Sequence, residues 1–278
     1  MTDIYDSIDV LFPIDAEHQE IYQEQFSAGI QYIKKQKLAV TTIVRNVSNV
    51  CNNNLQRIIE FLSYFDPASS VYIYENDSMD DTPAKIKYFI EINELDNKVH
   101  LKTERLDTPY MPLSSSTVRT TNMANARISC YNMIENPQLY DYILVVDLDF
   151  VDLSFNGLVN SFGWLSNHNE IHGVCGNTFE NLTGNNYNPK YTNYDSFAFR
   201  LNHWEPIPMG WFPNFILPIG SEPMPINSGF GGTCIYRAEK YKPLYAGTDC
   251  EHVTLHHNLK SLFDFQLYYN PSQICRIN

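Results

Sequence analysis

The chain has few basic residues. Nineteen lysines and arginines stand against 32 aspartates and glutamates in 278 residues, so the formal net charge is −13. Such an acidic chain repels a phosphate backbone, which argues against nucleic acid as a partner. A small anion can still bind where the protein builds a local site for it. Disorder is also excluded, because hydrophobic residues make up 44% of the chain, enough for a sizeable core.

Long apolar runs are missing as well. The most apolar stretch, residues 142–146, stops at Asp147, far short of the roughly 20 residues that a membrane-spanning helix needs. The acidic N-terminus shows no basic segment followed by an apolar one, the pattern of a secretory signal peptide. The sequence therefore predicts a cytoplasmic protein without a membrane span.

Closely spaced cysteines are absent too. The six cysteines are scattered over the chain without a CxxC pair, which disfavours a zinc ribbon or a disulfide scaffold and predicts buried free thiols. The glycine-rich segment Gly229-Phe230-Gly231-Gly232 is not followed by Gly-Lys-Ser/Thr, so it is not a phosphate-binding P-loop. A tight turn is the alternative, and close approach of the backbone to a sugar is the functional interpretation.

The first 150 residues alternate between strand-like and helix-like segments. Runs of β-branched and aliphatic residues favour strands, and apolar residues three or four apart favour helices. Strands are expected at residues 38–47, 71–76, 99–104 and 142–150, and helices at 15–35, 52–65 and 117–134. Residues 85–95 fit either element. This alternation is typical of a parallel sheet flanked by helices, so the predicted fold is α/β.

Two carboxylates follow the most apolar expected strand. Asp147 and Asp149 come after four aliphatic residues, 143–146. Side chains two apart in a strand share one face, here at the carboxyl end of the strand, where α/β sheets bind ligands. The two charges repel unless a cation lies beside them, and Mg²⁺ or Mn²⁺ takes such oxygen ligands and bridges to phosphates. The pair predicts a metal–diphosphate site, with solvated acids in a turn as the alternative.

An apolar strand that ends in Asp147-Leu148-Asp149 resembles the DxD motif of nucleotide-sugar-dependent glycosyltransferases of the GT-A fold. Weaker matches follow in the order of that family. They are the opening strand with Arg45, Tyr74-Glu75-Asn76-Asp77, the helical segment that ends in Arg127, and Asn227-Ser228-Gly229. The stretch from Arg127 to Asp195 is also faintly similar to the fungal capsule-associated mannosyltransferases.

The resemblance implies a Rossmann-like GT-A domain over residues 1–278. Within it we expect a helical extension (1–37), a nucleotide-binding half (38–152) and a looser acceptor-binding half (153–278). A UDP- or GDP-sugar is the implied donor, Mn²⁺ or Mg²⁺ the implied cofactor, and a glycan or glycoconjugate the implied acceptor. The implied donor-binding residues are Arg45, Glu75, Asp77, Arg119, Arg127, Asp147, Asn227 and Gly229.

The basic side chains allow the same interpretation without the resemblance. Arg119 and Arg127 lie eight residues apart on one expected helix, and Arg45 ends the first strand. Arginine grips phosphate in bidentate fashion, so these three are candidates in a chain with few bases. Pairing with surface acids is the alternative. Glu75 and Asp77 are candidates to accept hydrogen bonds from a ribose or base, with turn-forming acids as the alternative.

A histidine-rich segment follows near the C-terminus. If residues 248–259 are helical, His252 and His256 share a face at a spacing that suits metal ligands. Val253 stands where a zinc protease needs Glu, so that class is disfavoured. In GT-A enzymes a late histidine often completes the metal shell, which implies Asp147, Asp149, His252 and His256 as ligands. Glu251 is the first candidate for the catalytic base and Asp195 the second. Surface histidines on a helix are the alternative.

The function predicted from the sequence is a metal-dependent glycosyltransferase that moves a sugar onto an acceptor hydroxyl. A base such as Glu251 or Asp195 favours inversion at the anomeric carbon, and the Asn227-x-Gly229 element favours retention, so both outcomes stay open. One alternative is a phosphohydrolase of the haloacid-dehalogenase type, because Asp147-Leu148-Asp149-Phe150-Val151 fits its Asp-x-Asp-x-Thr/Val pattern. A non-catalytic carbohydrate-binding module is the other alternative, and it leaves the carboxylate pair without a purpose.

Overall fold

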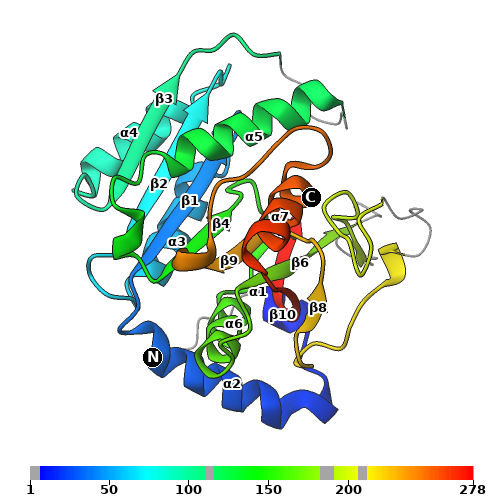
Figure 1. Ribbon diagram of the computed structural model, residues 1–278. Coiled ribbons are helices and arrows are strands. Elements are labelled where there is room, and N and C mark those ends of the chain that lie inside the picture. Colours follow the sequence, from blue (N-terminus) through cyan, green and yellow to red (C-terminus); the bar gives the residue numbers. More distant parts are fainter. Residues whose placement is uncertain (1–6, 110–115, 182–190, 206–211, 278) are drawn as a thin grey trace. The chain divides into compact units, whose positions relative to one another are not determined.

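The computed structural model describes residues 7–109, 116–181, 191–205 and 212–277 (Figure 1). Backbone contacts divide the chain into two compact units. The DxD unit comprises residues 35–149 and 235–265, and the terminal unit comprises residues 1–34, 150–234 and 266–278. The functional division at residues 37 and 152 stays a prediction.

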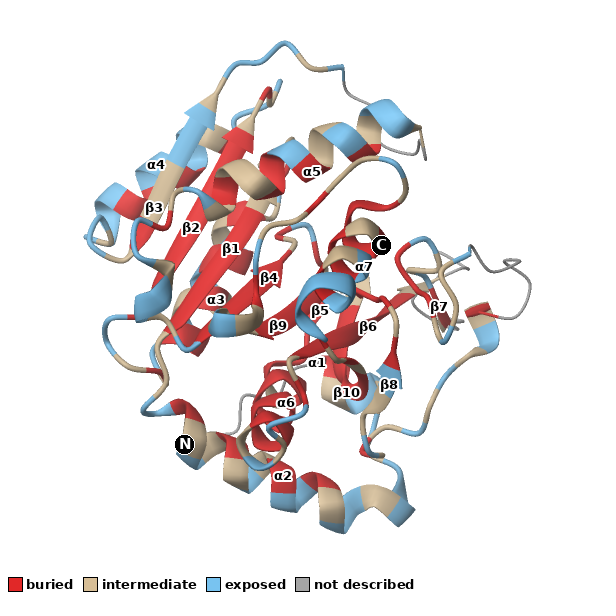
Figure 2. Ribbon diagram, viewed as in Figure 1, coloured by how far each residue is buried: buried red, intermediate tan, exposed pale blue. Residues whose placement is uncertain are grey.

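Parallel strands form the centre of the DxD unit. Their order is β3-β2-β1-β4, and β9 follows β4. The pairings of β1 with β2 and β4, and of β2 with β3, are all parallel. The strands are β1 (Leu38–Val44), β2 (Ser70–Asn76), β3 (Val99–Glu104), β4 (Tyr142–Val146) and β9 (Thr233–Arg237). Figure 2 shows β1, β2 and β4 almost wholly buried and β3 partly exposed, which agrees with the apolar sequence of β4 and with that of β1, where only Thr41 and Thr42 are polar.

Helices cover both faces of these strands. Helix α5 packs on β1 and β2 and crosses in front of them in Figure 1, whereas α3 and α4 lie behind. The helices are α3 (Cys51–Leu62), α4 (Thr82–Ile92), α5 (Thr117–Tyr131) and α7 (Glu251–Phe263), with 3₁₀ turns η2 (Pro137–Leu139) and η4 (Ala238–Lys240). The ambiguous segment at 85–95 is thus helical, and Pro83 sits in its first turn, where a missing N–H costs nothing.

Strand β4 is shorter than predicted. It ends at Val146, and residues 147–149 form a turn instead of continuing the strand to residue 150. Leu148 nevertheless points into the core, since it is 2% exposed, and its carbonyl accepts the side-chain amide of Asn54 at 2.8 Å. This anchor fixes the turn that carries Asp147 and Asp149.

The terminal unit combines a parallel pair of strands with antiparallel neighbours. Strand β6 pairs with β10 in parallel, whereas β5 and β8 pair with β10, and β7 with β6, in antiparallel fashion. The strands are β5 (Asp152–Leu153), β6 (Gly173–Asn181), β7 (Tyr191–Asn193), β8 (Met224–Ile226) and β10 (Leu267–Ile277). The helical elements are α1 (Ser7–Leu11), η1 (Ala16–His18), α2 (Gln19–Ile33), α6 (Phe155–Asn167) and η3 (Phe212–Asn214).

Glycines allow α2 and α6 to pack closely within the terminal unit. A Cβ on Gly29 would overlap the backbone of Val159, and one on Gly163 would overlap the backbone of Gln25. The helical extension predicted near the N-terminus therefore has a packing partner inside its own unit.

The predicted α/β class with a mostly parallel sheet and flanking helices is confirmed. All six cysteines are free and buried, as expected. Across the described residues, no helix has the length and apolar character needed to cross a membrane.

Candidate active site at the carboxyl end of β4

The two DxD carboxylates lie on the turn that follows β4. Asp147 is partly buried and Asp149 is exposed, with the buried Leu148 between them. The alternation expected from a strand thus persists, although the hydrogen-bonded ladder has ended. Both carboxylates stand at the carboxyl end of a central parallel strand, the edge at which α/β sheets bind ligands.

A buried arginine joins Asp147 to helix α7. Arg127, on α5, donates from Nη2 to Asp147 Oδ1 at 3.1 Å and from Nε to Glu251 Oε1 at 3.2 Å. Only 3% of the Arg127 side chain is exposed, against 33% of that of Asp147. Charge-assisted hydrogen bonds in such a dry environment hold the guanidinium in one orientation. The predicted proximity of Arg127 to the DxD strand is therefore observed, with Glu251 as its second partner.

Glu251 does not stand where an accessible base would. It begins α7, only 4% of its side chain is exposed, and it is engaged by Arg127. A carboxylate that is buried and paired in this way is not presented to an acceptor hydroxyl. The pairing with Arg127 gives Glu251 a structural partner, and its assignment as the first candidate base stays a prediction.

The carboxylates of the turn are held in an environment that disfavours their charge. The pKa of Asp147 is raised to about 7, chiefly by burial; Arg127 opposes this shift, and the negative charges of Asp149 and Glu251 add to it. The surrounding protein atoms also raise the pKa of Asp149 by partly shielding its carboxylate, although the residue as a whole is exposed. A cation placed beside such carboxylates stabilises their ionised form.

Helix α7 carries both predicted histidine ligands on one buried face. The rings of His252 and His256 lie 6.1 Å apart. A hydrogen bond of 2.9 Å joins His256 Nε2 to the hydroxyl of Tyr236, and Phe265 stacks on the same ring. Burial lowers the pKa of His256 to about 3 and also lowers the pKa of His252. The shared face is confirmed, but it is a core face.

The predicted set of four metal ligands is not brought together. In the part of the chain that the structure describes, no group of three or more His, Cys, Asp or Glu side chains is arranged to hold a metal ion. Asp147 and Asp149 do fit a hard divalent cation. Mg²⁺ characteristically takes one or two protein carboxylates and completes its shell with water and substrate phosphates. The donor set therefore fits a cation that is shared with a diphosphate, rather than one held by the protein alone.

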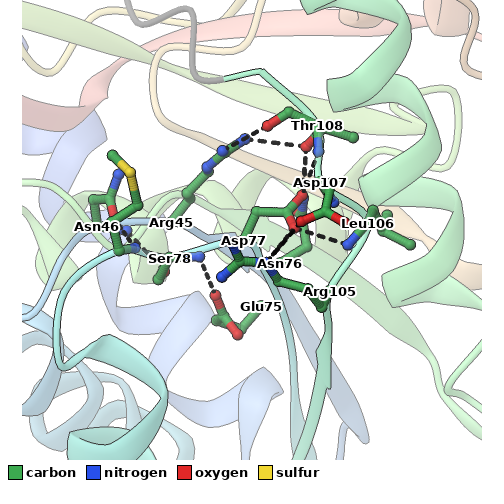
Figure 3. A network of polar contacts seen from close by, with 11 residues as sticks. Arg45, Asn46, Glu75, Asn76, Asp77, Ser78, Arg105, Leu106, Asp107 and Thr108 are labelled. Atoms are coloured by element: carbon green, nitrogen blue, oxygen red, sulfur yellow. Dashed lines mark hydrogen bonds and ion pairs between the residues drawn. The ribbon is translucent and has the colours of Figure 1, made fainter.

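Asp77 is the centre of a second polar network, at the carboxyl end of β2 (Figure 3). Its Oδ1 accepts the backbone N–H groups of Leu106 at 2.7 Å and Asp107 at 2.8 Å. Its Oδ2 accepts the backbone N–H of Thr108 at 3.1 Å, the Thr108 hydroxyl at 2.5 Å and the Asn76 amide at 3.0 Å. Burial opposes the charge of Asp77, yet these donors outweigh it and lower its pKa. Asp77 thus anchors the loop after β3.

The same network orients Arg45. Its Nη1 donates to Thr108 Oγ1 at 3.1 Å and its Nη2 to the Thr108 carbonyl at 2.8 Å. Figure 3 shows the guanidinium pointing toward Thr108, which is hydrogen-bonded to both Arg45 and Asp77. Glu75 is buried, and its Oε1 accepts the backbone N–H of Ser78 at 2.9 Å. The two acids of this segment therefore shape loops, which was the alternative interpretation.

Arg119 does not join Arg127. It lies two turns earlier on α5, half-exposed, and its backbone N–H is capped by the hydroxyl of Ser116. In the described part of the chain, the Arg119 side chain forms no ion pair with Asp147 or Asp149. Its role in donor binding stays a prediction.

Three predicted residues belong to the terminal unit. The Oδ2 atom of Asp195 accepts the backbone N–H of Gly231 at 2.8 Å, and the backbone N–H of Asn227 donates to the carbonyl of Arg200 at 2.8 Å. A Cβ on Gly229 would come within 2.8 Å of Cys175 Sγ. Packing against this thiol and against Ile226, which the Cβ would approach to 2.9 Å, favours a residue without a side chain there. The functional roles of the three residues stay predictions.

Thr108 and Tyr236 are the contributors that the sequence did not point to. Thr108 links Asp77 to Arg45, and Tyr236 binds His256. A threonine in a loop and a tyrosine in an apolar strand carry no motif. Only the pairing of β2 with β3, which places residues 104 to 108 beside Asp77, would have identified the first of them.

Comparison with known proteins agrees with this fold. No protein-family model matches the sequence, and no curated protein does either. Among solved structures, GalNAc-T7 with UDP, GalNAc and Mn²⁺ matches with a TM-score of 0.52 and 12% identity, over 87% of this chain and 44% of that one. The chain thus has the fold of GT-A glycosyltransferases, as predicted.

Two further matches have lower TM-scores. A mannosyltransferase from Pyrobaculum calidifontis, in complex with GDP-Man and Mn²⁺, gives 0.49 at 12% identity, over 94% of this chain and 65% of that one. Glucosyl-3-phosphoglycerate synthase from Mycobacterium tuberculosis gives 0.43 at 10% identity, over 92% and 73%. The chain spans less than two thirds of the mannosyltransferase and less than half of GalNAc-T7. The faint similarity to fungal mannosyltransferases stays a prediction.

Proposed function

We propose that this protein is a metal-dependent glycosyltransferase that transfers a sugar from a nucleotide-diphospho-sugar to an acceptor hydroxyl. The observation that carries the proposal is the Asp147-Leu148-Asp149 turn at the carboxyl end of β4, with an arginine bound to its first carboxylate. The fold supports the proposal, since it is the fold of enzymes of that class.

Asp147 and Asp149 are the residues that would hold Mn²⁺ or Mg²⁺. Such a cation, when bound, would neutralise the diphosphate leaving group. Asp149 is exposed and turned to solvent, whereas Asp147 uses only Oδ1 for Arg127. Anchoring of Leu148 by Asn54 keeps both carboxylates in place before a ligand arrives, so little ordering entropy remains to be lost on binding.

Arg45 is the basic side chain whose geometry best suits binding of the donor's diphosphate. Thr108 holds its guanidinium by two hydrogen bonds at the carboxyl end of β1, in the same parallel array as β4.

The haloacid-dehalogenase alternative is not favoured. The matched fold is that of glycosyltransferases, and Asp147 follows the fourth strand of the chain rather than one near its start. A carbohydrate-binding module would leave the carboxylate pair at the strand end without a role.

Thermal unfolding with a panel of nucleotides tests the proposal. UDP or GDP with Mn²⁺ is expected to stabilise the protein by about 3 kcal/mol at a ligand concentration of roughly 100 times Kd. The shift should disappear with EDTA and in Asp149→Ala. Stabilisation by glycans alone would indicate a binding module, and phosphatase turnover lost in Asp147→Asn would indicate a hydrolase. Either outcome would overturn the proposal.

A further inference from the structure

Arg127 has a second partner, Glu251, which the proposed reaction does not explain. Arg127 lies between two carboxylates, and different nitrogens contact each: Nη2 reaches Asp147, and Nε reaches Glu251. Glu251 and Arg127 are almost fully buried, while Asp147 keeps a third of its side chain exposed. The buried pair thus stands behind Asp147, on the side away from solvent.

The charges in this cluster do not cancel. When ionised, Asp147, Asp149 and Glu251 carry three negative charges and Arg127 one positive charge, which leaves two negative charges, the amount that one divalent cation neutralises. Without Glu251, Arg127 would cancel Asp147 directly, and a single negative charge would remain. Arginine stays protonated under all ordinary conditions, so it competes permanently with a cation for Asp147.

We infer that Glu251 is a positioning residue that neutralises Arg127 and thereby leaves Asp147 able to bind a divalent cation. The position at the first residue of α7 suits this role, because the positive end of the helix dipole favours an ionised carboxylate there. The inference rests on the proposed function, since it gives Glu251 a role toward the cation that Asp147 and Asp149 would hold. This role differs from that of catalytic base, which the sequence suggested for Glu251.

Two effects of removing the charge act in the same direction. In Glu251→Gln the field at the turn becomes more positive by one charge, which repels a cation. Arg127 also loses its second anion and binds Asp147 more tightly, which removes a ligand. The double variant Arg127→Gln/Glu251→Gln removes one charge of each sign, and it returns the cluster to two negative charges.

Calorimetric titration with Mn²⁺, without nucleotide and then with GDP or UDP, tests the inference. We expect Glu251→Gln to weaken Mn²⁺ binding by about tenfold or more, the scale of one nearby charge at an effective dielectric constant of about 20. The double variant should bind Mn²⁺ within about threefold of wild type. Glu239→Gln, an exposed residue with the same loss of charge, is the matched control and should leave binding unchanged.

The outcomes separate the inference from the proposed function. Wild-type affinity in a folded Glu251→Gln protein, or a double variant as weak as the single one, would overturn the inference, because a purely structural role predicts no recovery. If Glu251→Gln does not fold, the double variant decides the question, and loss of its Mn²⁺ binding while it stays folded would overturn the inference. Absence of Mn²⁺ binding by the wild-type protein with either nucleotide would instead overturn the proposed function.

Discussion

Two aspartate sites of the DxD unit occupy equivalent places and have opposite properties. Asp77 follows β2 and Asp147 follows β4, each at the carboxyl end of a parallel strand. Asp77 is buried among hydrogen-bond donors that lower its pKa, whereas the pKa of Asp147 is raised to about 7. The difference lies in the donors, because both carboxylates are opposed by burial.

The comparison separates structural acids from binding acids. A carboxylate whose two oxygens accept three backbone N–H groups and a hydroxyl has little left to offer a ligand, and its ionisation stabilises the fold. By contrast, Asp147 is paired with a single arginine and Asp149 is exposed, so these two carboxylates can still accept a cation. On this basis we propose the cation site at the turn after β4, whereas Asp77 supports the loop that holds Arg45.

The largest expected effect is on activity in Asp149→Ala. The proposed role of Asp149 predicts a loss of metal-dependent donor turnover of about 1,000-fold or more, since a metal ligand is removed. The side chain is exposed, so the free energy of unfolding should change by less than about 0.5 kcal/mol. Donor turnover and urea unfolding measured on one preparation check both parts. Turnover at the wild-type level would show that the β4 turn is not the site.

Arg127→Met should cause the largest loss of stability. Removal of the guanidinium leaves Glu251 buried without its counter-ion, and breaking a buried ion pair costs about 3–5 kcal/mol. Arg119→Met, on the same helix but half-exposed, should change the free energy of unfolding by no more than about 0.5 kcal/mol. Urea denaturation of the two variants measures the contrast, and equal effects would contradict the assignment of Arg127 as the buried link.

Asp77→Asn should lower the free energy of unfolding at neutral pH by about 1–3 kcal/mol, because an amide cannot accept every hydrogen bond that the carboxylate accepts. The pKa of Asp77 is lowered in the folded protein, so its contribution is complete above the unfolded pKa of about 4 and is lost as the pH falls below that value. The difference between variant and wild type should therefore narrow in acid. A difference independent of pH from 7 to 3 would argue against this carboxylate as the clamp.

His256 gives the smallest effect and tests whether α7 belongs to the core. Burial lowers the pKa of His256 to about 3 in the folded protein, below the unfolded value of about 6.5. Its contribution is thus complete above pH 6.5 and is lost below it, by up to about 1.4 kcal/mol per pH unit. His256→Phe should reduce the slope of stability against pH between 6.5 and 5 by about one proton.

The half-exposed His168 supplies the control for that measurement. His168→Gln should keep the wild-type slope, because the side chain lies at the surface, where it contacts Glu170 and Trp164, and not in the core. An unchanged slope in His256→Phe would mean that the His256 ring is not held neutral in the core. The interpretation of the shared face of α7 would then have to be revised.

Much of the fold was predictable because local pattern and tertiary structure agree. The apolar run of β4 and the β-branched run of β1 are buried along almost their whole length, and Ser116, an N-cap residue, marks the start of α5. The end of β4 was predicted four residues too late, because Leu148 and Phe150 are apolar and buried although the ladder stops at Val146. Buried apolar residues in a turn give the same sequence pattern as the continuation of a strand.

The site was predictable only in part. The sequence placed Asp147 and Asp149 at the strand end and Arg127 close by, since the order of elements brings them to one edge of the sheet. It could not tell that Asp77 is saturated or that Glu251 is buried, because both depend on donors that are remote in sequence, Thr108 and Arg127. The spacing of His252 and His256 correctly indicated a shared helix face but not whether that face is exposed to solvent or buried.

The most direct test of the central claim is a calorimetric titration of GDP or UDP with and without Mn²⁺, on wild type and Asp149→Ala. Asp81→Ala, an exposed aspartate beside α4, is the matched control. The account predicts nucleotide binding that requires Mn²⁺ in the wild-type and control proteins and falls at least about tenfold in Asp149→Ala. Nucleotide binding that is equally strong in EDTA, or unchanged in Asp149→Ala, would contradict it.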